Sequence, residues 1–461
     1  MHARPASARF GGGVLIGALE QLINELTARL RIPLIPLLTV PTGDVLEPQG
    51  ADQRAGADAV QRVIDRLTSR ADVDPQRARA TRPLLAATAI EVAAGGATHL
   101  VFDAVAPGAD WARAGQTCAF VAVYVDGRYH STAVVLGERS EGYEVNLAGL
   151  PAGRHDIELR AATDAAPVAA RVSQLRTRVV EGEQALVDRL APVIELRDVD
   201  RGAGNSVAAN DAPLLLVPSI TRNADATRTI EYRMLLSNED GGTPAPELFA
   251  QYGRGVDVEP TYRVRVDAQG HVLEARYQSA LHQWRDYDGV LEHGRPVLRV
   301  STANSMVSAR TGGSRPAERW SDAAIGLVAG DPSDYDVMRS HGWTWAVMSK
   351  ELLREGKVAA AGAVRTKLQV ADPRRYVFLG PISDAARAAI ALRGGLEVVL
   401  ADGRRVLARA VTGFASGVFR QTALELPADA LADAVQGVAL LGVQALVLTA
   451  TFGARQLAHA A

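Results

Sequence analysis

The feature that most constrains this chain is a hydrophobic period of two, which begins near residue 83 and is broken at intervals by turn residues. The apolar run 120–125 is followed by Asp126-Gly127, a dipeptide typical of type I′ hairpin turns, and then by a second alternating run at 129–136. Alternation of this kind buries one face of each strand. Segment 81–180 is therefore predicted to be an antiparallel β-sandwich of immunoglobulin-like or jelly-roll type, acting as an accessory domain.

The same alternation returns later in the chain, for example at 230–236, and is mixed there with helical patterns. An apolar stripe formed by Trp345, Met348 and Leu352 predicts one helix, and an Ala-rich stretch from Ser383 predicts another. The predicted fold is mostly β and multidomain. Its four segments are an N-terminal helical segment at 1–80, the β-sandwich at 81–180, a β-rich central domain containing aromatic residues and histidines at 205–370, and a C-terminal β-rich or α+β domain at 371–461.

The N-terminal segment allows two interpretations. Residues 14–30 have an amphipathic helical pattern, which is typical of a packing helix but also of a targeting or membrane-surface segment; a second helix is expected at 58–67. No stretch reaches the roughly 18 uninterrupted apolar residues of a membrane-spanning helix, so no transmembrane span is expected.

Charge and cysteine content exclude several classes of partner and site. A formal net charge of −2 over 461 residues gives no support for binding nucleic acid, and the one cysteine, Cys118, excludes an intramolecular disulfide and a multi-cysteine zinc site. Sandwich modules are common in bacterial proteins of the cell envelope, so a secreted or envelope protein is expected, with a cytoplasmic one left open.

Aromatic residues gather in the central domain, where four of the five tryptophans lie between residues 284 and 345. Exposed indole and phenol rings stack on the apolar faces of sugars, and neighbouring polar side chains bond the hydroxyl groups. We expect Trp284 and Trp320 to be exposed and Trp345 to be buried. The predicted glycan-binding residues are Trp284, Tyr287, Trp320, Asn304 and Arg319.

A second candidate site is the polar stretch from residue 282 onward. If residues 282–288 are extended, His282, Asp286 and Asp288 lie on one face, and His293 follows shortly after. Imidazoles and carboxylates that converge could hold a divalent metal or act as base and acid. The alternative is a solvated loop or edge strand whose acids balance nearby arginines.

A third candidate is the loop that begins at Ser237. Asn238, Glu239 and Asp240 supply hard oxygen ligands beside two glycines, a composition that would suit calcium. The spacing differs from that of an EF-hand loop, and the alternative is an ordinary turn in which Asn and Asp bond the backbone.

No H-E-x-x-H helix, P-loop or G-x-S-x-G elbow is present, so no motif names a reaction. The predicted function is a non-catalytic binding or surface protein whose central domain recognises a glycan or another polymer. Two alternatives stay open: a metal-assisted hydrolase of a glycosidic or phosphoester bond, and a structural subunit that self-associates.

Overall fold

The computed structural model describes residues 74–439 except 95–96, 114–115, 138–140, 165–167, 197–211, 238, 240–242, 302–304, 310–317, 322–336, 339, 381, 412–413, 415–420 and 432–434. The chain divides into two compact units: a first unit of Met1–Leu236 and Val258–Asp331, and a second unit of Ser237–Asp257 and Pro332–Ala461. The helices predicted at 14–30 and 58–67 lie outside the described residues. The four-segment division stays a prediction beside these two units.

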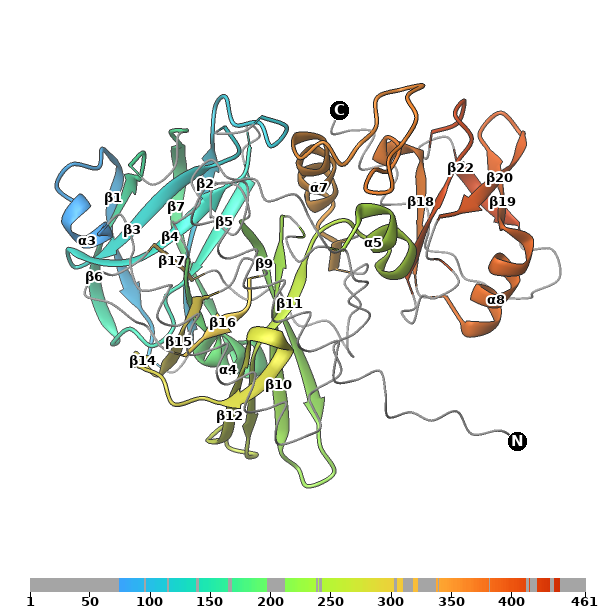
Figure 1. The fold of residues 1–461 in the computed structure, drawn as a ribbon. Helices are drawn as coiled ribbons and strands as arrows, with labels where there is room; N and C mark the ends of the chain where they lie inside the picture. Colours follow the sequence, from blue (N-terminus) through green and yellow to red (C-terminus); the bar gives the residue numbers. More distant parts are fainter. Residues whose placement is uncertain are drawn as a thin grey trace. The chain divides into compact units, whose positions relative to one another are not determined.

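The first unit begins with a β-sandwich (Figure 1), which confirms the predicted fold class. Its two antiparallel sheets have the strand orders β1-β6-β3-β4 and β5-β2-β7. The strands are β1 (Leu84–Val92), β2 (Ala97–Val105), β3 (Ala119–Val125), β4 (Arg128–Val135), β5 (Glu141–Asn146), β6 (Gly153–Ala161) and β7 (Arg171–Val180). One apolar cluster, which includes Leu100, Phe102, Val121 and Leu159, draws side chains from both sheets and forms the core between them.

Local sequence explains two features of this sandwich. Asp126 and Gly127 have φ values of 49° and 74°, the left-handed conformation that a type I′ turn requires, so the predicted β3–β4 hairpin is confirmed. The short helix α3 (Pro75–Ala78) precedes β1, and the Asp74 carboxylate caps it by accepting from the backbone N–H groups of Gln76 and Arg77.

A helix and a small sheet follow the sandwich in the first unit. Helix α4 (Gly182–Leu190) leads into β8 (Val193–Glu195), which pairs in parallel with β15 (Arg295–Val300) and antiparallel with β17 (Arg319–Trp320). The two-residue strands β14 (Leu291–Glu292) and β16 (Val307–Ser308) pair with β15.

The remaining sheet of the first unit is a five-stranded antiparallel meander with the order β13-β12-β11-β10-β9. Its strands are β9 (Pro213–Arg222), β10 (Arg228–Leu236), β11 (Val258–Val266), β12 (Val272–Ser279) and β13 (Gln283–Asp286), with the 3-10 turn η1 (Ala280–His282) between the last two. Tyr232 on β10 is fully buried, and its hydroxyl donates to the Val187 carbonyl of α4. This apolar side of the sheet therefore packs inward.

The second unit combines a five-stranded sheet of order β18-β21-β20-β19-β22 with helices. Its elements are α5 (Ala245–Tyr252), α7 (Trp343–Arg354), η2 (Pro373–Arg375), β18 (Tyr376–Leu379), α8 (Asp384–Arg393), β19 (Gly395–Leu400), β20 (Arg405–Ala410), β21 (Thr422–Glu425) and β22 (Val435–Ala439). Trp345, Met348 and Leu352 are buried along α7, as the helical stripe predicted. Ser383 caps α8 by accepting from the Ala386 N–H, so this predicted helix is also confirmed.

Within the part of the chain that the structure describes, no helix combines the length and the apolar composition needed to cross a membrane.

Candidate functional site on the polar face of the five-stranded sheet

The meander of the first unit has one apolar and one polar face. Along β10, Ile230, Tyr232 and Met234 are buried, whereas Glu231 and Arg233 between them are half-buried. Because successive side chains of a strand point to opposite sides of the sheet, the charged residues of neighbouring strands collect on the side opposite the tyrosines. We call this side the polar face; the members discussed below are Glu231, Arg263, Arg265, Glu274, Arg276, Gln278, Trp284 and Asp286.

Strand register places charged residues of four strands next to one another on the polar face. Glu231 of β10 pairs with Arg263 of β11, Arg263 with Arg276 of β12, and Arg276 with Asp286 of β13. Directly opposite residues in antiparallel strands have Cβ atoms about 4.5–5.5 Å apart, so each pair can interact. A row with two arginines at its centre and an acid at each end therefore crosses four strands.

Trp284 lies beside this row, two residues before Asp286 on β13, and contacts Arg263 of the row. The Arg263 guanidinium carbon lies 4.1 Å from the centroid of the Trp284 ring, in a cation–π contact. The same guanidinium donates through Nε and Nη2 to Glu231 Oε2, at 2.8 and 2.5 Å. Glu231 thus fixes Arg263, and Arg263 fixes the half-buried indole, so the ring is pre-organised.

Gln278 is the cross-strand neighbour of Trp284. Its side chain is almost fully buried, with 6% of the residue exposed, and its Oε1 has no hydrogen-bond donor among the described residues. A buried acceptor without a partner costs about 1–3 kcal/mol, so it favours a partner such as an ordered water or a bound polar ligand. An unsatisfied acceptor therefore lies beside the indole.

His282 and Glu259 form an ion-pair contact outside the polar face, because Glu259 lies opposite Met234 on the apolar side of the sheet. His282 Nδ1 lies 3.6 Å from Glu259 Oε2, and only 6% of the Glu259 side chain is exposed. His282 has φ of 55°, a conformation that residues with a Cβ rarely adopt. The η1 turn holds this strained backbone, which sets the position of the imidazole.

The polar face as a whole supplies a ring surface, a buried acceptor and paired charges, all on strands instead of loops. Strand-mounted side chains of this kind can orient a polar ligand through several fixed hydrogen bonds. Among the described residues, no group of three or more histidine, cysteine or acidic side chains could hold a metal ion.

The predicted glycan-binding residues separate in the structure. Trp284 lies on the polar face, but Trp320 is only 3% exposed, so the prediction that it is exposed was wrong. Trp320 belongs to β17, where it pairs with Ile194 of β8, and this long-range pairing buries it although its sequence neighbours are polar.

Tyr287 and Arg319 are engaged in the interior of the first unit. The Tyr287 hydroxyl accepts from the Val297 N–H at 3.0 Å, its ring packs edge-on against Tyr262, and burial raises its pKa to about 12. Arg319 forms ion pairs with Glu292 and Glu195 and lies outside the polar face. Asn304 lies outside the described residues.

The predicted metal or acid–base set is not assembled. Strand β13 ends at Asp286, so the expected extended stretch stops there; the Asp286 side chain is 91% exposed and lies 3.4 Å from Arg276 Nε. Asp288 is exposed beyond the strand, and His293 is exposed in the turn between β14 and β15. Since these residues form no metal-binding group with His282, the predicted metal set was wrong.

Two of the three predicted calcium ligands, Asn238 and Asp240, lie outside the described residues. Glu239 is described, and its backbone carbonyl accepts from Lys357 Nζ at 3.1 Å. Calcium at this loop stays a prediction.

Six members of the polar face were absent from the predicted site: Glu231, Arg263, Arg265, Glu274, Arg276 and Gln278. The alternation of charged and apolar residues in β10 and β11 was a visible signal for the polar face. Which residues lie next to each other on neighbouring strands depends on the strand register, and the register cannot be read from the sequence of any one strand.

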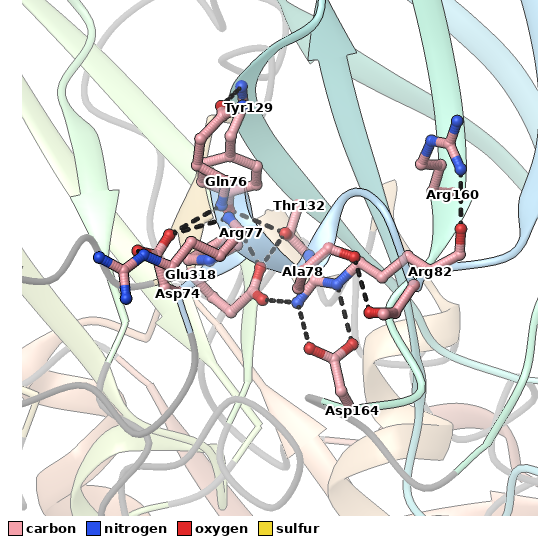
Figure 2. Close-up of polar contacts among 12 residues, drawn as sticks. Asp74, Gln76, Arg77, Ala78, Arg82, Tyr129, Thr132, Arg160, Asp164 and Glu318 are labelled. Atoms are coloured by element: carbon pink, nitrogen blue, oxygen red, sulfur yellow. Dashed lines mark hydrogen bonds and ion pairs between the residues drawn. The ribbon is translucent and has the colours of Figure 1, made fainter.

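A second polar cluster in the first unit connects segments that lie far apart in the sequence. Figure 2 shows Arg82 beside Asp164 and Glu318, with Thr132 and Tyr129 also bonded to Glu318. Although burial lowers the pKa of Arg82, the charge of Glu318 and the hydrogen bonds that Arg82 donates to both acids raise it above its ordinary value. The acids neutralise Arg82, so this cluster joins segments of the first unit.

No protein-family model and no curated protein matches the sequence. Among solved structures, the chain is similar to the CBM36-1 domain of a multidomain xylanase from the hindgut metagenome of Trinervitermes trinervoides, with 18% identity and a TM-score of 0.17 over 21% of this chain and 71% of that one. It is also similar to the C-terminal domain of EclA, described as a sugar-binding protein, with 8% identity and a TM-score of 0.16 over 24% of this chain and 74% of that one. A family 35 carbohydrate-binding module from an environmental isolate matches with 17% identity and a TM-score of 0.15, over 22% and 74% of the two chains.

Proposed function

We propose that this chain is a non-catalytic binding protein whose polar face recognises a glycan or a similar hydroxyl-rich polymer. The observation that carries the proposal is Trp284, an indole held in place by Arg263 and flanked by the unsatisfied Oε1 of Gln278. The sugar-binding names of the matched structures add no weight, because TM-scores of 0.15–0.17 reflect little shared arrangement.

The chemistry of a sugar ring fits this combination. One face of a pyranose is lined by C–H groups and packs on an aromatic ring, while its hydroxyl groups both donate and accept hydrogen bonds. A rigid site loses little conformational entropy on binding, and each buried polar group that gains a partner avoids its desolvation cost.

The metal-assisted hydrolase is not favoured by the structure. Among the described residues, its predicted ligands do not form a group of three or more side chains that could hold a metal ion. Self-association as a structural subunit stays a prediction. An apparent mass that rises with protein concentration in sedimentation would support it.

Affinity gel electrophoresis tests the proposal. Polysaccharides cast in a native gel should retard the wild-type protein, and Trp284→Ala should abolish the retardation by removing the ring surface. Trp343→Ala is the matched control, because Trp343 is also half-buried but lies on α7 of the second unit. Normal mobility of the wild type across a broad panel of neutral and acidic polysaccharides would refute glycan binding.

A further inference from the structure

The charges of the polar face indicate which class of glycan this face can bind. Arg263 is bound by Glu231, as described above. Arg265 Nε lies 3.5 Å from Glu274 Oε2, and Arg276 Nε lies 3.4 Å from Asp286 Oδ1. Each of these three guanidinium groups is thus neutralised by a carboxylate of the same sheet.

A polyanionic ligand would have to break these pairs. A uronate or sulfate that approached Arg263 would compete with Glu231 and would bring a second negative charge within a few ångströms of it. Like charges at this separation repel, and the carboxylate displaced from its partner would need new solvation. These three arginines therefore offer no net attraction to an anion.

The buried acceptor beside Trp284 also favours a neutral ligand. Gln278 Oε1 can be satisfied only by a hydrogen-bond donor. A sugar hydroxyl can donate to it. Ionised carboxylates and sulfates carry no hydrogen, so an anionic substituent at this position would leave Gln278 unsatisfied.

We infer that the polar face selects neutral, hydroxyl-rich polysaccharides and discriminates against polyanionic ones. This inference rests on the proposed function, since it specifies the ligand of the same site. The discriminating groups are Gln278 as acceptor and the Glu231–Arg263 and Asp286–Arg276 pairs, which neutralise the face.

Matched polymer pairs test the inference on the full chain. Each pair shares a backbone and differs in charge: hydroxyethylcellulose with carboxymethylcellulose, and dextran with dextran sulfate. We expect retardation by a neutral member with an affinity at least about tenfold above that for its anionic partner. That affinity should change little between low and high salt, because no charges are exchanged.

Three variants separate the roles of the groups. Gln278→Leu keeps the side-chain volume but removes the acceptor, and should weaken neutral binding about tenfold, whereas Gln278→Glu, which keeps an acceptor, should retain more of it. Asp286→Asn alters a side chain that is 91% exposed, so the fold should persist. Because it releases Arg276, it should raise affinity for the anionic polymers in a salt-sensitive way. Circular dichroism verifies the fold of each variant.

Stronger binding of the anionic members, weakened by salt, would overturn the inference while leaving glycan binding intact. Equal affinity of wild type and Gln278→Leu for a neutral polymer would also overturn it. Absence of binding to every polymer would instead refute the proposed function itself.

Discussion

Gly149 occupies a position at which no other residue fits. Its φ is +90°, and a Cβ atom placed on it would lie 2.2 Å from the His293 carbonyl oxygen. The turn after β5 therefore packs backbone to backbone against the β14–β15 turn. The absence of a side chain is what lets the sandwich and the small sheet of the first unit approach each other here.

Gly149→Ala should lower the free energy of unfolding by several kcal/mol, because it combines left-handed strain of about 1–2 kcal/mol with a clash against backbone. Gly108→Ala is the matched control: its φ is +83°, and nothing lies within 4 Å of the added Cβ. Urea unfolding measures both. Equal losses for the two variants would contradict the close packing at Gly149.

At the residue scale, sequence reasoning located the region of the candidate site but not its membership. Trp284 was singled out because of its polar neighbours, and it does lie on the polar face. The same reasoning failed for Trp320, because burial there comes from a strand more than a hundred residues away. Gln278 could not be predicted as a site residue, because its importance comes from a carbonyl oxygen that has no hydrogen-bond donor in the folded structure.

At the scale of elements, hairpins and capped helices were predictable because their determinants are local. The Asp126-Gly127 turn and the Ser383 cap each depend on residues within four positions of one another. Connections between elements depend on groups far apart in sequence, and buried charges make two of these connections.

His99 of β2 connects the sandwich to α4. Its side chain has no exposed surface, and its Nδ1 and Nε2 lie 3.1 Å from Glu144 of β5 and from Asp188 of α4, respectively. Burial opposes the charged imidazole, but Asp188 and Glu144 overcome this and raise the pKa of His99. The stability that this charge contributes is fully present below the unfolded-state pKa of about 6.5, and is lost as pH rises through the folded-state pKa.

His99→Gln should therefore cost about 1–3 kcal/mol near pH 6 and progressively less as the pH rises toward 9. Urea unfolding at a series of pH values measures this difference. His271→Gln is the control, since the His271 side chain is 78% exposed, and it should change stability little at any pH. A cost for His99→Gln that stays constant or grows with pH would show that the imidazole is not charged in the folded state.

Arg82 makes the second connection, from the segment before β1 to Glu318, which precedes β17. Glu318→Leu should cost about 3–5 kcal/mol, since it leaves a buried guanidinium with one acid fewer. Adding Arg82→Met to Glu318→Leu should recover part of that loss. As a control, Arg79→Met removes a more exposed pair with Glu158 and should cost much less than Glu318→Leu. Strictly additive losses in the double variant would contradict a coupled pair.

At the scale of the whole molecule, the division into two units could not be read from the sequence. The second unit is discontinuous, because Ser237–Asp257 joins Pro332–Ala461 across an intervening stretch of the first unit. Hydrophobic periodicity and turn signals report only neighbours along the chain. Only the packing of α5 reveals to which unit it belongs.

Helix α5 contributes to the core of the second unit. The Phe249 ring lies 4.8 Å from Tyr376 and 5.3 Å from Phe378 between centroids, and the Ala250 carbonyl accepts from Thr422 Oγ1 at 2.8 Å. Gly253, which ends the helix with φ of +61°, leaves no space for a Cβ beside the Thr422 backbone. The sheet of this unit thus packs against α5, a helix that lies about 120 residues before β18 in the sequence.

A fragment of residues 332–461 should therefore lack a cooperative core, because an apolar surface and the Thr422 hydroxyl lose their partners. Joining residues 237–257 to its N-terminus through a flexible linker should restore a sharp urea transition and a near-ultraviolet circular dichroism signal from the aromatic cluster. The matched control carries Phe249→Ala in the joined segment and should lose about 3–5 kcal/mol or fail to fold. Cooperative unfolding of the 332–461 fragment alone, with the same midpoint as the joined one, would mean that α5 covers a core already complete without it.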